Sequence, residues 1–232
     1  WNRRGRPPFS VQALRPRRSP AAGKCRLAKH TDWLVWLIRS KATTVATMTT
    51  SNEAGPGQRK RGGAREELLQ AALKVIRTKG YAATTVDDIC AAAGRTKGSF
   101  FHHFDSKEAL GVAAADYWAE TTSAMFALAP YHAPADPADR VLAYVDFRKS
   151  ILQGELPDFT CLVGTMVQEA YESNPAIRDA CASSILGHAA TLEADIEAAM
   201  EARGIVADCT AASLARHTQA VLQGSFILAK AT

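Results

Sequence analysis

Aromatic side chains are scarce in this chain, and so are the other signs of a β-rich or disulfide-bonded protein. They make up 7% of the 232 residues. No long segment alternates polar and apolar residues, which is the pattern of a half-buried strand. The five cysteines are scattered without a CxxC pair, which argues against a disulfide framework or a zinc site. We therefore predict an all-α protein of the reducing cytoplasm without a bound metal.

Long apolar runs and catalytic motifs are missing as well. The apolar run from Trp33 to Ile38 is too short for a membrane-spanning helix, which needs about 20 residues. The sequence contains no GxSxG, HExxH or P-loop pattern and no Glu-x-x-His repeat, the motifs that would indicate common catalytic sites. We expect no membrane association, no cofactor and no enzymatic activity.

Charge is distributed unevenly along the chain. Residues 1–47 hold 11 lysines and arginines against one aspartate, and residues 58–110 hold 10 basic against 6 acidic residues. Residues 111–232 reverse the balance, with 7 basic and 15 acidic residues. A basic segment suits a phosphate backbone, which would repel the acidic remainder. Charge by itself is a weak signal, because many soluble proteins are this uneven.

The beginning of the sequence has the composition of a segment that cannot bury a core. Residues 1–57 are rich in arginine and proline and show no periodicity, which is typical of disorder. The first methionine is Met48. We expect native translation to start there, with the upstream residues absent from the native protein. The alternative is a basic arm that adds nonspecific affinity for DNA.

Two helices are predicted in the segment that follows the basic arm. From Ala64 to Lys79 the apolar residues recur at helical spacing, and Gly80 then ends the helix. Thr85 precedes Asp88 by three residues, a pattern that resembles a capping box. The second helix starts there and stops at Gly94.

A third short helix is predicted in the stretch TKGSFFHHF, from Thr96 to Phe104. Thr96 is placed to accept a hydrogen bond from the backbone N–H of Ser99. At about 100° per residue, Phe100 and Phe104 fall together on one side. The polar arc roughly opposite consists of Thr96, Ser99, His102 and His103. Gly98 leaves room for close approach of another backbone. This is the pattern of a helix-turn-helix with a polar outer face.

A polar arc is more often a solvated helix face, so the flanking charges matter. The basic arm from Gln58 to Arg65 comes before the first helix, and Lys107 follows the third. Lysine and arginine side chains commonly bind the phosphates on both sides of a helix that lies in a DNA groove. The combination favours DNA over plain solvent exposure.

The segment from Gly80 to Leu110, GYAATTVDDICAAAGRTKGSFFHHFDSKEAL, resembles the DNA-binding region of the TetR/AcrR family of bacterial transcriptional regulators. The resemblance implies a helix-turn-helix domain over residues 58–108 and an effector-binding and dimerisation domain over residues 109–232. The DNA-binding residues that we predict from it and from the basic arm are Arg59, Lys60, Arg61, Thr85, Arg95, Thr96, Lys97, Gly98, Ser99, Phe101, His102, His103 and Lys107.

The resemblance also implies separate roles for these residues. Those that would face the major groove are Thr96, Lys97, Ser99 and His102. Those that would hold phosphates are Thr85, His103 and Lys107. Two positions depart from the family pattern. Phe101 stands where a tyrosine is usual, so a hydroxyl contact to phosphate is missing, and Arg95 stands where a small apolar residue is usual.

Further helices account for the rest of the chain. Asp105, three residues before Glu108, is predicted to cap the first of them. The predicted segments are 106–129, 138–153, 161–172, one very long helix from Pro175 to Arg203, and a last helix that starts near Thr210. By resemblance, the last two helices pair in a homodimer, and the small residues suited to that packing are Ala211, Ala215, Thr218 and Ser225. The helical pattern is still running at Thr232, so we expect a longer native C-terminus.

Aromatic and soft side chains on these helices are candidates for an effector pocket. They are Trp118, Tyr144, Phe147, Met166, Tyr171 and His188. Ordinary core packing is the alternative for each of them. Cys161 lies near the start of a predicted helix, where thiols are activated, so a redox- or electrophile-responsive regulator is a second possibility. A cysteine that merely fills space is the simpler alternative.

The sequence as a whole predicts a transcriptional regulator, most simply a repressor. A homodimer would place two recognition helices about 34 Å apart on a near-palindromic double-stranded operator. A small apolar or aromatic effector would release it by shifting the population of the dimer. An enzyme built on a helical bundle and an interaction module without DNA binding are the alternatives from other classes.

Overall fold

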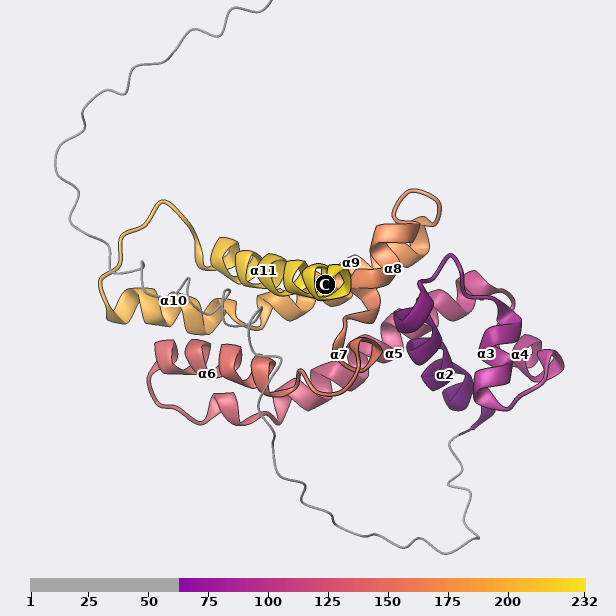
Figure 1. Ribbon diagram of the computed structural model, residues 1–232. Helices are drawn as coiled ribbons and strands as arrows, with labels where there is room; N and C mark the ends of the chain where they lie inside the picture. Colours follow the sequence, from indigo (N-terminus) through magenta and orange to yellow (C-terminus); the bar gives the residue numbers. More distant parts are fainter. Residues whose placement is uncertain (1–62) are drawn as a thin grey trace, which may run out of the picture. The chain divides into compact units, whose positions relative to one another are not determined.

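The computed structural model describes residues 63–232, and within this range the regular structure is entirely helical (Figure 1). The predicted all-α fold is confirmed. The predicted leader over residues 1–57 and the basic-arm residues Arg59, Lys60 and Arg61 lie outside the described residues. No helix in the described part of the chain is long and apolar enough to cross a membrane.

The first three helices have the predicted starts and stops. They are α2 (Ala64–Lys79), α3 (Val86–Ala93) and α4 (Lys97–His103). Thr85 closes the predicted capping box with Asp88 at the start of α3. Gly94 ends α3 with φ 62° and ψ 35°, a left-handed conformation that glycine adopts without a steric penalty. The turn between α3 and α4 therefore depends on a glycine, as the sequence predicts.

These helices close over a shared apolar core. Leu68 and Ile76 of α2, Ile89 of α3 and Phe100 of α4 are completely buried. Burial of one such side chain is worth roughly 1.5–3 kcal/mol. The same core continues through Leu110 and into the C-terminal helices, so it crosses the predicted boundary between residues 108 and 109.

The C-terminal helices follow without a long linker. They are α5 (Lys107–Ala127), α6 (Pro137–Ser150), α7 (Leu156–Phe159), α8 (Leu162–Ala170), α9 (Pro175–Ala190), α10 (Glu193–Ala202) and α11 (Ala211–Ala231), with a 3-10 turn at Pro130–His132. In Figure 1, α5 leads from the group of α2, α3 and α4 to the remaining helices. It packs against α2, α8 and α9.

Two sequence predictions about these helices are wrong. The cap of α5 is Ser106, whose Oγ accepts from the backbone N–H of Ala109 at 3.1 Å, and not Asp105. The very long helix from Pro175 to Arg203 is in fact α9 and α10, separated at Thr191 and Leu192. The Thr191 hydroxyl donates to the His188 carbonyl at 2.8 Å, and such bonds compete with the helix ladder. Leu192 still turns inward and is buried, so the apolar spacing continued through the break.

The proposed small-residue face of the last helix needs one correction. Ala215 of α11 is completely buried within its own chain, because it belongs to a second apolar core with Tyr144, Leu192 and Ile196. It is therefore unavailable to a partner. Ala211, Thr218 and Ser225 remain partly exposed.

Candidate nucleic-acid interface and ligand cavity

Helix α4 separates its side chains into two faces, as predicted. Phe100 is completely buried and Phe104 is 4% exposed. Thr96 caps the helix by accepting from the Ser99 N–H at 3.2 Å. The outward positions Thr96, Lys97, Gly98 and His102 are exposed, while Ser99 and His103 are partly exposed. Packing on one face thus holds a polar face toward the solvent.

Phe101 breaks this division, since a large apolar ring stands on the outside. Its ring is 54% exposed and meets Phe100 edge to face, with the centroids 5.2 Å apart. A single exposed ring is common on protein surfaces, and this one lies on the helix that carries the predicted DNA contacts. The family pattern described above has a tyrosine at this position. Phe101 lacks its hydroxyl, so only apolar contacts are available to the ring.

Gly98 is a helical glycine that the described fold does not need. A Cβ at this position would meet only the Thr96 Oγ1, at 3.7 Å, an ordinary van der Waals distance. Its φ is not in the left-handed region. Glycine inside a helix costs stability relative to alanine, so the described residues give no structural reason for it. Close approach of an external group is a reason that would account for it.

The basic residues around α4 are engaged on the surface. The Arg95 guanidinium, in the turn between α3 and α4, forms an ion pair with the Glu67 carboxylate of α2. Lys97 Nζ lies 2.9 Å from the Asp87 carboxylate of α3. Exposed pairs of this kind contribute little to stability, so both cations can exchange their partners for phosphates at little cost.

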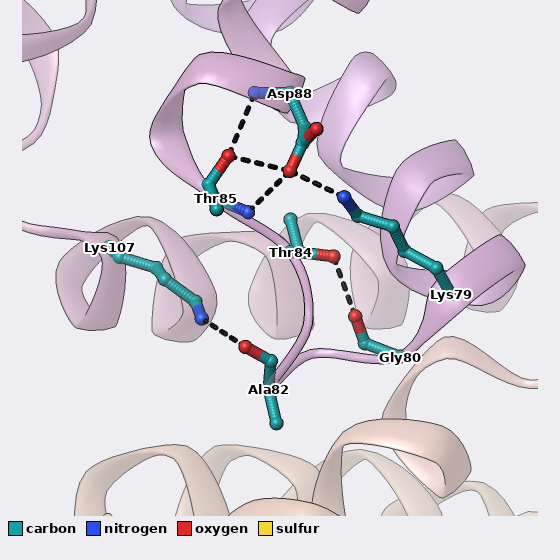
Figure 2. Close-up of polar contacts among 7 residues, drawn as sticks. All are labelled: Lys79, Gly80, Ala82, Thr84, Thr85, Asp88 and Lys107. Atoms are coloured by element: carbon teal, nitrogen blue, oxygen red, sulfur yellow. Dashed lines mark hydrogen bonds and ion pairs between the residues drawn. The ribbon is translucent and has the colours of Figure 1, made fainter.

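The start of α3 is braced by the network in Figure 2. Asp88 accepts from Thr85 Oγ1 at 2.6 Å and from Lys79 Nζ at 2.5 Å. The hydrogen bonds from Lys79 and Thr85 hold the pKa of the Asp88 carboxyl far below its usual range. Thr84 Oγ1 donates to the Gly80 carbonyl at 2.6 Å. The turn between α2 and α3 is therefore fixed by side-chain hydrogen bonds at both ends.

The Lys107 side chain packs beside this turn. Its Nζ donates to the Ala82 carbonyl at 3.3 Å (Figure 2) and stands 4.4 Å from the centroid of the Tyr81 ring. Burial lowers the pKa of the Lys107 ammonium. The residue thus ties the start of α5 to the turn, in addition to the phosphate-binding role predicted for it.

A cavity of about 340 Å³ lies among the C-terminal helices. Trp118 and His188, two of the six predicted effector residues, line it. The other four do not. Tyr144 and Met166 are completely buried, and Phe147 packs edge to face on Phe126. Tyr171 is 57% exposed, so its ring faces the solvent.

A chain of hydrogen bonds runs along one side of the cavity. Gln219 Nε2 of α11 donates to the Tyr144 hydroxyl at 2.9 Å, and this hydroxyl lies 3.0 Å from His188 Nε2. The direction of this second hydrogen bond is set by the tautomer of the imidazole, since the hydroxyl can donate to Nε2 or accept from it. Burial, with a contribution from the nearby Arg148 charge, lowers the pKa of His188 to about 4. The imidazole is therefore neutral at pH 7.

Arg77 connects the cavity with the N-terminal helices. It belongs to α2 and also lines the cavity. Its Nη1 donates to the Asp158 carbonyl at 3.2 Å, and its guanidinium stands 5.2 Å from the centroid of the Trp118 ring. Outside the cavity lining, the Glu169 carboxylate of α8 accepts from the Ala82 N–H at 2.6 Å and joins α8 to the turn after α2. Arg77 is thus both a residue of α2 and part of the cavity wall.

Cys161 is the N-cap of α8, and its Sγ accepts from the Gly164 N–H at 3.4 Å. The residue also lines the cavity. Cys181, whose thiol lies close enough to Cys161 to interact with it, does not line the cavity, and burial raises its pKa to about 12. Most of the polar cavity residues, Arg77, Arg148 and Gln219 among them, were not predicted from the sequence, since a charged or amide residue on a helix is usually solvated.

Comparison with known proteins agrees with this geometry. Residues 68–114 match the family model described as bacterial regulatory proteins, tetR family. Residues 137–232 match a model described as tetracyclin repressor-like, C-terminal domain. A solved TetR transcriptional regulator from Chloroflexus aurantiacus is 30% identical, with 72% of this chain and 84% of that chain covered and a TM-score of 0.62. The chain belongs to the TetR family.

Two further relatives resemble this chain, one over most of its length and one over a short segment. The regulatory protein TetR from Rhodobacter sphaeroides has a TM-score of 0.65 at 24% identity, with 72% of this chain and 88% of that chain covered. The transcriptional repressor KstR2 from Rhodococcus jostii is 50% identical over 50 residues, which are 22% of this chain and 24% of that protein. The chain therefore spans about a quarter of that curated relative, and the alignment is confined to a short segment.

Proposed function

We propose that this TetR-family protein is a dimeric transcriptional repressor that a small effector releases from its operator. The single observation that carries the proposal is the two-sided helix α4. Its phenylalanines hold it in the core, and its outer face presents Thr96, Lys97 and Gly98 without a covering element in the described chain. A helix held this way enters the major groove with its N-terminal residues toward the bases.

Most of the predicted DNA contacts among the described residues lie on or beside α4, and this placement suggests a role for each of them. The groove-facing residues are Thr96, Lys97, Ser99 and His102. Thr85, His103 and Lys107 are proposed as phosphate contacts around them, and Phe101 contributes apolar contact where the family has a hydroxyl. Contacts to phosphates set the register of the helix, whereas contacts to base edges set the sequence that is read.

The dimer is proposed to form through α9 and α11. Leu186 of α9 is 53% exposed, and Ile227 and Leu228 of α11 are each 50% exposed. The two helices pack against each other within the chain. Exposed apolar residues on adjacent helices indicate a protein interface. A twofold dimer would bury them and present two copies of α4 to successive major grooves, about 34 Å apart.

Release is proposed to work through the contacts that the cavity shares with the N-terminal helices. A ligand that displaces the Arg77 guanidinium from Trp118 or from the Asp158 carbonyl would disturb the end of α2. The ligand binds better to the dimer whose α4 helices do not match the groove spacing, and it therefore shifts the population toward that state. The coupling needs only a small rotation of α5, because α5 follows α4 directly.

The test is a gel-shift titration of the full chain against DNA from upstream of its own coding region, at about 50 and about 200 mM salt. We expect saturable binding that competitor DNA does not displace and that weakens steeply with salt. Lys97→Ala should weaken it by about tenfold or more, whereas the matched surface change Lys74→Ala on α2 should not. Equal affinities of the two variants, or no saturable binding by a confirmed dimer, would contradict the proposal.

A further inference from the structure

We propose that the cavity binds a small organic carboxylate, whose acid group pairs with Arg148 and whose apolar body lies against Trp118, Met125 and Phe126 of α5. The proposal rests on the proposed function in taking this cavity as the effector site. It goes further in naming the chemical class of the effector and the residue that recognises its charge.

The charges that line the cavity do not balance. They are the guanidinium groups of Arg77 and Arg148 and the carboxylate of Asp158. Asp158 acts mainly on Arg77, since its charge raises the pKa of that guanidinium while burial lowers it more strongly. His188 contributes no charge at pH 7, because its pKa is lowered to about 4. One positive charge remains, and it is on Arg148.

Arg148 is held in place without a carboxylate partner. Its guanidinium carbon stands 5.3 Å from the centroid of the Phe126 ring and 6.0 Å from that of Tyr144. In the described part of the chain it forms no ion pair within 4 Å. Its charge nevertheless acts inside the cavity, where it lowers the pKa of His188. The guanidinium also shares a side-chain hydrogen bond with Tyr144. Its remaining N–H groups have no anion paired with them and can bind a carboxylate.

A neutral imidazole lies close to this charge. The Nε2 atom of His188 is 3.0 Å from the Tyr144 hydroxyl, which also accepts from Gln219 Nε2. His188 lines the same cavity as Arg148. The histidine is uncharged at pH 7 and the arginine is positive, so neither offers a negative charge that would repel an acid.

The rest of the lining favours an apolar body of modest size. Trp118, Met125 and Phe126 contribute apolar surface from α5. Ile151, the C-cap residue of α6, and Phe226 of α11 add to it. The volume of about 340 Å³ is near the lower end of ligand pockets, which range over roughly 300–1,000 Å³. A compact aryl or alkyl acid fits this combination of one charge and an apolar surround.

The test is isothermal titration calorimetry of the full chain with three acids and their neutral primary amides. The acids are 3-phenylpropanoate, hexanoate and 4-methylbenzoate. We expect at least one acid to bind about tenfold or more tightly than its amide, a difference of about 1.4 kcal/mol. Arg148→Gln should reduce that ratio to near one. Arg178→Gln, which removes an exposed arginine paired with Asp179 on α9, should keep the wild-type ratio.

Arg148→Met serves as a second variant in case the glutamine disturbs folding, because it keeps an apolar contact with Phe126 and removes the charge. If no acid binds more tightly than its amide, or if both folded Arg148 variants keep the wild-type ratio, the proposal is wrong. No DNA is present in this titration. A preference for acids in a protein that binds no operator would therefore refute the proposed function alone, and operator binding without the preference would refute the carboxylate alone.

Discussion

On α4, the residues that face the core and those that face outward alternate within one short helix, and each is placed by the local helical period. In the cavity, Arg77, Arg148 and Gln219 come from three helices that are far apart in the sequence. They line one cavity only after α2, α6 and α11 have packed. The two regions differ in what determines them: the helix period sets the first, and the tertiary fold sets the second.

The largest expected effect tests whether packing alone holds the outer face of α4 in place. Phe100→Ala removes a completely buried ring and should lower the free energy of unfolding by about 3–5 kcal/mol. Operator binding should fall with it, because α4 loses its anchor. Urea denaturation followed by circular dichroism measures the first change. A loss below about 1 kcal/mol would mean that Phe100 does not anchor the helix.

The second effect belongs to the cavity and depends on pH. The pKa of His188 is about 4 in the folded chain and about 6.5 in the unfolded one. Between these values the unfolded chain takes up a proton that the folded chain does not, so stability falls as the pH drops from about 6.5 to about 4. We expect this group to contribute about 2 kcal/mol of that loss.

His188→Gln should remove this contribution. The measurement is the difference in the free energy of unfolding between pH 7 and pH 4.5, for the wild type and the variant. Other carboxylates titrate in both proteins, so only the difference between them reports on His188. Equal pH dependence in the two proteins would mean that His188 is not buried in its neutral form.

The third effect concerns the capping box that begins α3. Thr85→Ala removes the Oγ1 that accepts from the Asp88 N–H at 3.2 Å and should cost about 1 kcal/mol of stability. Thr85→Ser keeps the hydroxyl and should restore most of it. Thermal unfolding of the two variants measures the difference. If serine and alanine are equally destabilising, the lost methyl group and not the cap explains the effect.

The sequence was sufficient for the N-terminal helices because their determinants are local. Thr85, Gly94 and Thr96 each act within a few residues, so the ends of α3 and α4 could be predicted. The break at Thr191 was missed since Leu192 remains buried and keeps the apolar spacing. The cap of α5 was assigned one residue too early, because Asp105 and Ser106 are both good caps and only the backbone decides between them.

The cavity was predictable only in part. Trp118 and His188 could be predicted because an aromatic ring and a histidine on the apolar face of a helix are residue types that also line ligand pockets. Arg148 and Gln219 carry no such signal, since their surroundings come from other helices. Met166 and Tyr171 looked equally suitable in the sequence, yet packing buries the first and exposes the second.

The smallest expected change in stability gives the most direct test of the central claim, that the outer face of α4 contacts DNA. The measurement is the thermal stability and the operator affinity of Gly98→Ala in the same preparation. A Cβ fits at Gly98 without a close contact, so the variant should be more stable by about 0.5–1 kcal/mol. It should nevertheless bind the operator less tightly, because the added methyl group obstructs the duplex. Gain of stability with unchanged operator affinity would contradict the claim.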